Sequence, residues 1–154
     1  MARRHASLTT VKDNARLFMN ILVIDAHGGG VGKQLVTSLR ETFPDLDIMA
    51  VGTNSTATSV MLKAGANHAA TGENAVVVAC RKADIIIGPL GIVIADSLYG
   101  EITPTMALAV AQSNATRILI PFNHCDNTVV GIGDYTVGKL VQEAIDEVAK
   151  RLKR

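Results

Sequence analysis

Short apolar runs alternate along this chain with longer segments of helical periodicity. The apolar runs, which predict strands, span residues 21–24, 47–51, 67–70, 84–88 and 117–122. Helical spacing of apolar residues, together with start and stop signals, predicts helices over residues 33–43, 56–64, 73–82, 103–112 and 137–152. Continuous apolar strands that are connected by helices are typical of a parallel sheet covered on both faces.

Two segments allow more than one interpretation. Residues 76–78 are three valines, which suit a strand, but their place between two predicted strands favours the helix over 73–82. Val129 and Val130 could form one further strand. We expect a single three-layer, Rossmann-like α/β domain with a mostly parallel sheet of about five to six strands and helices on both faces. Ligands of such sheets bind at the carboxyl ends of the strands, so the candidate site lies in the loops there.

The composition fits this fold and argues against a nucleic-acid partner. Apolar residues make up 48% of the chain, but only 3% of it is aromatic and it has no tryptophan. Single-stranded nucleic acids are bound by stacking on aromatic side chains, which this chain lacks. The net charge is +1, and the basic residues gather near the two ends: Arg3, Arg4, Lys12 and Arg16, then Lys150, Arg151, Lys153 and Arg154. The rest of the chain is net acidic, so a nucleic-acid-binding face is not indicated.

Neither a membrane span nor a disulfide framework is indicated. The longest apolar stretch, residues 85–95, is interrupted by two glycines and a proline and is too short to span a bilayer. Cys80 and Cys125 are far apart and belong to no CxxC motif, which is typical of reduced thiols in a cytoplasmic protein. No membrane partner is therefore expected.

The first 18 residues differ from the rest of the chain. They carry arginines but lack the apolar core of a secretory signal. We interpret residues 1–18 as an N-terminal extension ahead of a functional start at Met19. An organelle presequence and a basic arm that docks on a partner are the alternatives. The Rossmann-like domain is then expected to span residues 19–154.

A glycine-rich loop follows the first predicted strand and carries the strongest ligand-binding signal. It contains Gly28, Gly29, Gly30 and Gly32 and is followed by Lys33. Glycines let the backbone approach a bulky anion, and the next helix presents free N–H groups and a favourable dipole. Neither the dinucleotide fingerprint nor the ATPase phosphate loop is intact, because His27 replaces the first glycine of both. A phosphate or nucleotide site and a tight turn needed only for packing both fit the sequence.

Polar residues also follow the second and third predicted strands. Thr53, Asn54 and Ser55 stand where a nicotinamide-dinucleotide site would have an acidic ribose ligand, which argues against ordinary NAD binding. These residues can hydrogen-bond hydroxyl groups or a phosphate, or they can cap the next helix. Glu73 is a candidate base or ribose ligand, and the alternative is a carboxylate that stabilises a helix N-terminus.

The stretch after the strand at 84–88 is apolar but broken by glycines, as expected of a loop shaped around a ligand. We assign Gly88 and Gly91 to the candidate binding site. Asp96 and Glu101 are five residues apart in the sequence and, with Glu73, are the candidates for a catalytic acid or base. Their spacing alone does not establish that the two carboxylates converge.

A polar cluster follows the last predicted strand. Asn123 is a further candidate ligand-binding residue. The weak candidates for a zinc or iron site are His27, His124 and Cys125, to which His68 could be added. Cys125 is also a candidate nucleophile. Adjacent residues of a strand point to opposite faces, and no CxxC or HxxxH motif is present, so no metal is expected.

A set of motifs runs from about residue 20 to about residue 134 and falls mainly on the predicted strand-end loops. It comprises Val23-Ile24-Asp25, Gly28-Gly29-Gly30-Val31-Gly32-Lys33, Gly52-Thr53-Asn54-Ser55, Ala57-Thr58, Met61-Leu62-Lys63-Ala64-Gly65-Ala66, Thr71-Gly72-Glu73-Asn74-Ala75, Gly88-Pro89-Leu90-Gly91-Ile92-Val93, Ala95-Asp96-Ser97-Leu98, Gly100-Glu101-Ile102-Thr103-Pro104 and Met106-Ala107. The set resembles the DUF3842 family, small bacterial proteins of unknown function. The resemblance implies a standalone protein that begins near Met19, without implying a reaction or a cofactor. His27 stands where the family leads us to expect glutamine, so the family does not support a histidine-based role.

Three functions are compatible with these features. The preferred one is a protein that binds a phosphorylated small molecule or nucleotide at the strand ends, with the phosphate on the glycine-rich loop. The second is a non-catalytic, homo-oligomeric interaction or regulatory subunit, because the stretch 88–100 and the many small aliphatic residues suit an interface. The third is a metal-dependent hydrolase that uses His27, His124, Cys125 or Glu73. The ligand, and whether a reaction follows binding, are not determined by the sequence.

Overall fold

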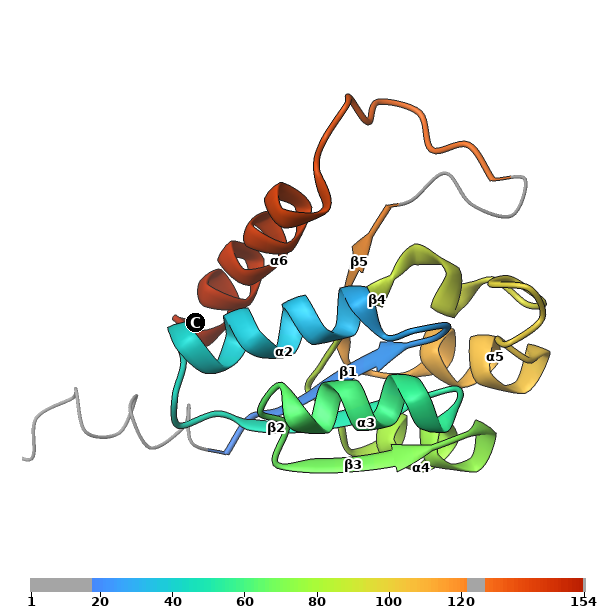
Figure 1. Cartoon of the computed structure of the whole chain (residues 1–154), viewed down its shortest axis with the longest axis horizontal. Helices are drawn as coiled ribbons and strands as arrows, with labels where there is room; N and C mark the ends of the chain where they lie inside the picture. Colours follow the sequence, from blue (N-terminus) through green and yellow to red (C-terminus); the bar gives the residue numbers. More distant parts are fainter. Residues whose placement is uncertain (1–17, 122–126, 154) are drawn as a thin grey trace, which may run out of the picture.

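The computed structural model describes residues 18–121 and 127–153 and contains a five-stranded parallel sheet (Figure 1). The strands are β1 (Asn20–Asp25), β2 (Asp47–Gly52), β3 (His68–Thr71), β4 (Ile85–Pro89) and β5 (Thr116–Ile120). The helices are α2 (Gly30–Thr42), α3 (Ser55–Lys63), α4 (Glu73–Lys82), α5 (Pro104–Gln112) and α6 (Val137–Leu152), with a short 3-10 helix, η1 (Leu90–Val93). The strand order is β3-β2-β1-β4-β5, and all neighbouring pairs are parallel. The predicted Rossmann-like α/β fold is confirmed.

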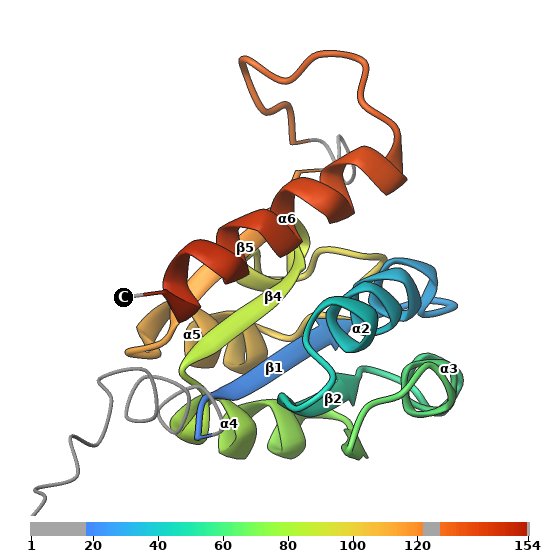
Figure 2. The same cartoon turned by 90° about the vertical axis from the view of Figure 1, so that its left-hand side faces the viewer.

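The sheet separates two hydrophobic clusters, one beneath each layer of helices (Figure 2). Because side chains alternate along a strand, Ile21 and Val23 of β1 pack beneath α2, α3 and α6. Leu22 and Ile24 of the same strand pack beneath α4 and α5. Helices cover both faces, and this is the physical reason why residues 21–24 of β1 and 85–87 of β4 are continuously apolar rather than alternating.

Helix α5 begins at the position that its local capping signal indicates. The hydroxyl of Thr103 accepts a hydrogen bond from the N–H of Met106, and Pro104 is the first residue of α5, as predicted. The valine-rich segment over 73–82 is helix α4, which buries Val76 and Cys80. The helix predicted over residues 137–152 is α6.

Some local predictions were wrong. Helix α2 begins at Gly30 rather than at residue 33, because Gly29 has a left-handed backbone (φ 72°) that turns the chain directly into the helix. Val129 and Val130 form no strand. Strand β5 ends at Ile120, before Pro121, which has no N–H with which to continue the ladder. Asn123, His124 and Cys125 lie outside the described residues.

The direction in which the chain leaves the sheet changes between two neighbouring strands. The helix after β1 covers one face, and the helix after β4 covers the other. The carboxyl ends of β1 and β4 therefore form the switch point at which open α/β sheets bind ligands. None of the helices in the described part of the chain is long and apolar enough to cross a membrane.

Candidate functional site

The carboxylate of Asp25, the last residue of β1, holds the start of α2 from inside the protein. This residue is only 5% exposed. Its Oδ2 atom accepts a hydrogen bond from the N–H of Gly32 at 2.7 Å, and Oδ1 accepts one from the N–H of Ala26 at 2.8 Å. N–H groups in the first turn of a helix have no partner within the helix, and the helix dipole favours a negative charge there. Asp25 is not among the site residues predicted from the sequence, although a carboxylate directly before a glycine-rich loop is a usable signal.

Three other N–H groups of the same loop form no hydrogen bond within the described part of the chain. They belong to Gly28, Gly30 and Val31. A Cβ atom added at Gly28 or Gly30 would have no atom within 4 Å, so the outer side of the loop is open at both residues. Lys33, one turn into α2, is exposed. These are the groups that an anion requires at a helix N-terminus.

Two glycines of this loop serve close packing. A Cβ atom at Gly29 would lie 2.8 Å from the Cα atom of Ala57, at the start of α3. At Gly32 it would overlap the side chain of Met61 and lie 2.9 Å from the Cβ atom of Asp25. Gly29 and Gly32 are therefore needed for packing, which is one of the two roles that the sequence allowed. Gly28 and Gly30 face open space.

The glycine in β4, Gly88, and the glycine in the 3-10 helix that follows it, Gly91, are also closely packed. A Cβ atom at Gly88 would overlap the carbonyl oxygen of Ile24 in the neighbouring strand. At Gly91 it would lie 3.1 Å from side-chain atoms of both Ser97 and Leu98. In this region small residues let one element approach another, and the chain fills the space itself.

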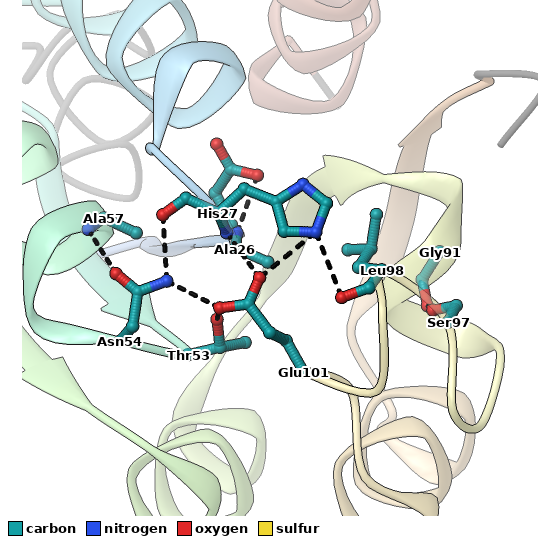
Figure 3. Close-up of polar contacts among 10 residues, drawn as sticks. Ala26, His27, Thr53, Asn54, Ala57, Gly91, Ser97, Leu98 and Glu101 are labelled. Atoms are coloured by element: carbon teal, nitrogen blue, oxygen red, sulfur yellow. Dashed lines mark hydrogen bonds and ion pairs between the residues drawn. The ribbon is translucent and has the colours of Figure 1, made fainter. Parts of the chain in front are cut away.

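Glu101 reaches across the strand ends from the loop between β4 and α5 (Figure 3). Its Oε2 atom accepts a hydrogen bond from the backbone N–H of His27 at 2.8 Å. Its Oε1 atom accepts bonds from Nδ2 of Asn54 at 2.7 Å and from Oγ1 of Thr53 at 3.1 Å. The imidazole Nε2 atom of His27 lies 3.2 Å from Oε2. One carboxylate thus connects the loops that follow β1, β2 and β4.

The loops on both sides of this contact have unusual backbone conformations. His27 has a φ of 52°, and Leu98 and Tyr99 have φ values of 55° and 57°. Residues other than glycine rarely adopt this left-handed backbone conformation, so the backbone is strained at each of these three residues. Nε2 of His27 lies 3.0 Å from the carbonyl oxygen of Leu98, and its ring centroid is 5.4 Å from that of Tyr99. The contacts between the two loops hold both in these conformations.

The three polar residues at the end of β2 have separate roles. Oδ1 of Asn54 accepts a hydrogen bond from the N–H of Ala57 at 2.9 Å, so Asn54 caps α3. Its Nδ2 group and Thr53 bind Glu101 instead. Ser55 is exposed as the first residue of α3. Of these three residues, Asn54 therefore has the helix-capping role that the sequence allowed.

No hydrogen bond among the described residues joins any two of the three candidate catalytic carboxylates. Glu73 is exposed at the N-terminus of α4, where its Oε1 atom accepts a hydrogen bond from Thr103 at 2.6 Å. Asp96 is exposed and is not among the described residues that contact the carboxylate of Glu101. Among the described contacts, Glu101 is the candidate that bonds to the loop after β1.

The two carboxylates beside the loop have opposite pKa shifts. Burial raises the pKa of Asp25, although the N–H groups of Gly32 and Ala26 partly offset it. Partial burial would also raise the pKa of Glu101, but the hydrogen bonds from Asn54, His27 and Thr53 lower it overall. Glu101 is therefore ionised at neutral pH.

The described residues do not assemble a metal site. No group of three or more His, Cys, Asp or Glu side chains in residues 18–121 and 127–153 is placed to hold a metal ion. His68 is exposed on β3, with its Nε2 atom 3.6 Å from Oδ1 of Asp47. Cys80 is buried in α4, and burial raises the pKa of its thiol to about 11, which disfavours the nucleophilic thiolate.

This arrangement of strand-end loops can be compared with known families. Residues 20–153 match the family described as a domain of unknown function, DUF3842. The chain belongs to the DUF3842 family. The resemblance seen in the sequence motifs is thus confirmed, and the matched range of this DUF3842 chain includes both the glycine-rich loop and Glu101. The family description assigns no activity to these residues.

One solved structure with a similar fold is a dodecameric FMN-dependent UbiX-like decarboxylase from Escherichia coli O157:H7. Its sequence is 18% identical, the match covers 85% of this chain and 76% of that chain, and the TM-score is 0.42. At such values neither the ligand nor the assembly of that enzyme transfers to this DUF3842 chain. Comparison with curated proteins gave no match.

Proposed function

We propose that this chain binds a phosphorylated small molecule or nucleotide at the carboxyl ends of β1 and β4. One observation carries the proposal. The N–H groups of Gly28, Gly30 and Val31 have no acceptor in the described part of the chain, and the space beside both glycines is open. Phosphate oxygens are suited to such a row of N–H groups because the helix dipole adds a partial positive charge. Lys33 adds a full positive charge one turn further along.

The two acidic residues beside the loop restrict how such a ligand can lie. Asp25 already takes the N–H of Gly32, and Glu101 already takes the N–H of His27. Because Glu101 is ionised, it repels a phosphate on its own side of the loop. The phosphate is therefore proposed to bind on the outer side, between Gly28 and Lys33. The ligand's hydroxyl groups would then face Glu101, which suits a sugar phosphate or nucleotide better than inorganic phosphate.

The experiment is a thermal unfolding series with nucleotides, dinucleotides and sugar phosphates. A ligand present at about 100 times its Kd stabilises the folded state by about 2.7 kcal/mol. Gly30→Ala places a methyl group in the open space, and Lys33→Ala removes the charge, so both should abolish the stabilisation. No stabilisation of the unaltered protein by any member of the panel would overturn the proposal.

A matched control is available in another helix. Gly138 is the second residue of α6 and, like Gly30, would have no atom within 4 Å of an added Cβ. Gly138→Ala therefore makes the same chemical change near a helix N-terminus without touching the loop. It should keep the full response to the ligand. If Gly30→Ala and Lys33→Ala respond as strongly as Gly138→Ala, the ligand binds elsewhere.

A further inference from the structure

The outward face of α5 carries no charge. The helix contains only uncharged residues from Pro104 to Gln112, and it buries Met106, Ala107 and Val110 against the sheet. Leu108 points outward and is 55% exposed. A surface helix normally has charged and polar residues on its outer face, so α5 is typical of a helix that is covered on that side too.

Helices α4 and α5 lie next to each other on one face of the sheet (Figure 2). Residues of both helices line a groove. Its volume is about 460 Å³. Val77 of α4 and Leu108 and Ala109 of α5 line its apolar part, and Thr105 and Gln112 line it on α5 as well. The groove has an apolar centre halfway along both helices.

Two opposite charges flank this centre on α4. Glu73, Val77 and Arg81 are spaced four residues apart, so they lie in one row along the helix. The Cα atoms of Glu73 and Arg81 are about 12 Å apart at the helical rise per residue. Both are exposed, and neither forms an ion pair with another described residue. The row therefore presents an acidic end, an apolar middle and a basic end.

We propose that the groove between α4 and α5 is the interface of a two-fold symmetric dimer of this chain. A two-fold axis near Val77 reverses the row in the second copy, because a symmetric interface uses the same patch on both subunits. Glu73 then faces the partner's Arg81, and Arg81 faces the partner's Glu73. Leu108 and Val77 of both copies meet in the middle, away from water. A row with two like charges at its ends would not be complementary to itself in this way.

This proposed interface differs from the one expected from the sequence. The stretch 88–100 buries Ile92 and Leu98 in the chain's own core, so those side chains are not available to a second copy. The dimer is independent of the proposed ligand site, because it uses the outer face of α4 and α5 and leaves Gly28–Lys33 uncovered.

The decisive experiment measures mass in solution by light scattering, for two variants alone and mixed. Glu73→Arg leaves two basic ends on the row, and Arg81→Glu leaves two acidic ends. Each variant alone should dissociate, with a dimer dissociation constant raised by about tenfold or more. An equimolar mixture should form a heterodimer, because both contacts between the two variants again join opposite charges.

Three further measurements test whether dissociation results from the loss of this particular interface. Glu41→Arg on α2 and Lys63→Glu on α3 make the same charge changes on the opposite face and should remain dimeric. Leu108→Glu should be monomeric alone, because the axis brings the two introduced charges together. Circular dichroism of each variant checks that it is folded. A monomeric unaltered protein, dimers that survive both Glu73→Arg and Arg81→Glu, or a mixture of folded variants that fails to associate would each overturn the proposal.

Discussion

The side-chain oxygen Oδ2 of Asp25 accepts a hydrogen bond from the N–H of Gly32 at 2.7 Å, so the last residue of β1 anchors the first turn of α2. The close approach of Gly32 to the Cβ atom of Asp25 makes this bond possible. The carboxylate of Asp25 therefore stabilises the first turn of α2, and the absence of a side chain at Gly32 leaves room for that carboxylate. Both residues flank the loop that is proposed to bind phosphate.

Removal of this anchor should destabilise the protein. Asp25→Ala leaves the buried N–H of Gly32 without an acceptor, which costs about 1–3 kcal/mol. Urea unfolding gives the free energy directly. Asp84→Ala is the matched control, because Oδ2 of Asp84 accepts an equivalent bond from the N–H of Asn20 at 2.8 Å in an exposed position. Equal losses for the two variants would show that burial of the Asp25 contact adds nothing.

Asp25 should make the protein less stable as pH rises. Its pKa is raised in the folded state by burial, so the folded protein holds a proton that the unfolded chain loses at about pH 4. Stability therefore falls as pH rises from that value through the folded pKa. Asp25→Asn cannot titrate, so the free energy of unfolding of the unaltered protein minus that of Asp25→Asn should decrease over this range. An increase would contradict the assigned shift.

Glu101 should have the opposite effect. Its pKa is lowered in the folded state, so its contribution is complete above the unfolded value of about 4.3 and is lost as pH falls through the folded pKa. At neutral pH, Glu101→Gln should cost about 1–2 kcal/mol, because neutral hydrogen bonds replace those to a charged acceptor. The difference from the unaltered protein should vanish in acid.

A second readout locates the effect of Glu101. Its bond to the N–H of His27 protects that amide, so hydrogen exchange at His27 should accelerate in Glu101→Gln. Glu41→Gln, at an exposed position in α2, is the control and should leave the exchange rate at His27 unchanged. Unchanged exchange in Glu101→Gln would show that the contact contributes little to holding the loop.

Neighbouring glycines of the loop should respond oppositely to alanine. Gly32→Ala introduces a Cβ atom that overlaps Met61, so a loss of about 1–3 kcal/mol is expected for overpacking. Gly30→Ala meets open space at a helical position and should instead stabilise the protein by about 0.5–1 kcal/mol. Thermal unfolding of the two variants without ligand checks both signs. Destabilisation by Gly30→Ala would indicate that the loop is packed there as well.

Much of the architecture was predictable because its signals are local. A run such as residues 21–24 is apolar whether or not its partner strands are known, and the Thr103-Pro104 pair indicates a helix start on its own. Strand-end loops then follow from the alternation of strands and helices. The sequence alone therefore predicted that the candidate site lies in these loops, although Asp25 was not among the predicted site residues.

The tertiary structure decided which of those residues meet. Glu101 is 74 residues from His27 in the sequence, and nothing local to either residue indicates their contact. It arises because the strand order places β1 between β2 and β4, which brings three distant loops to one edge of the sheet. Tertiary packing also decides the difference in surroundings between Gly30 and Gly32. Both are ordinary glycines in the sequence, and only the packing of α3 against α2 leaves one open and the other enclosed.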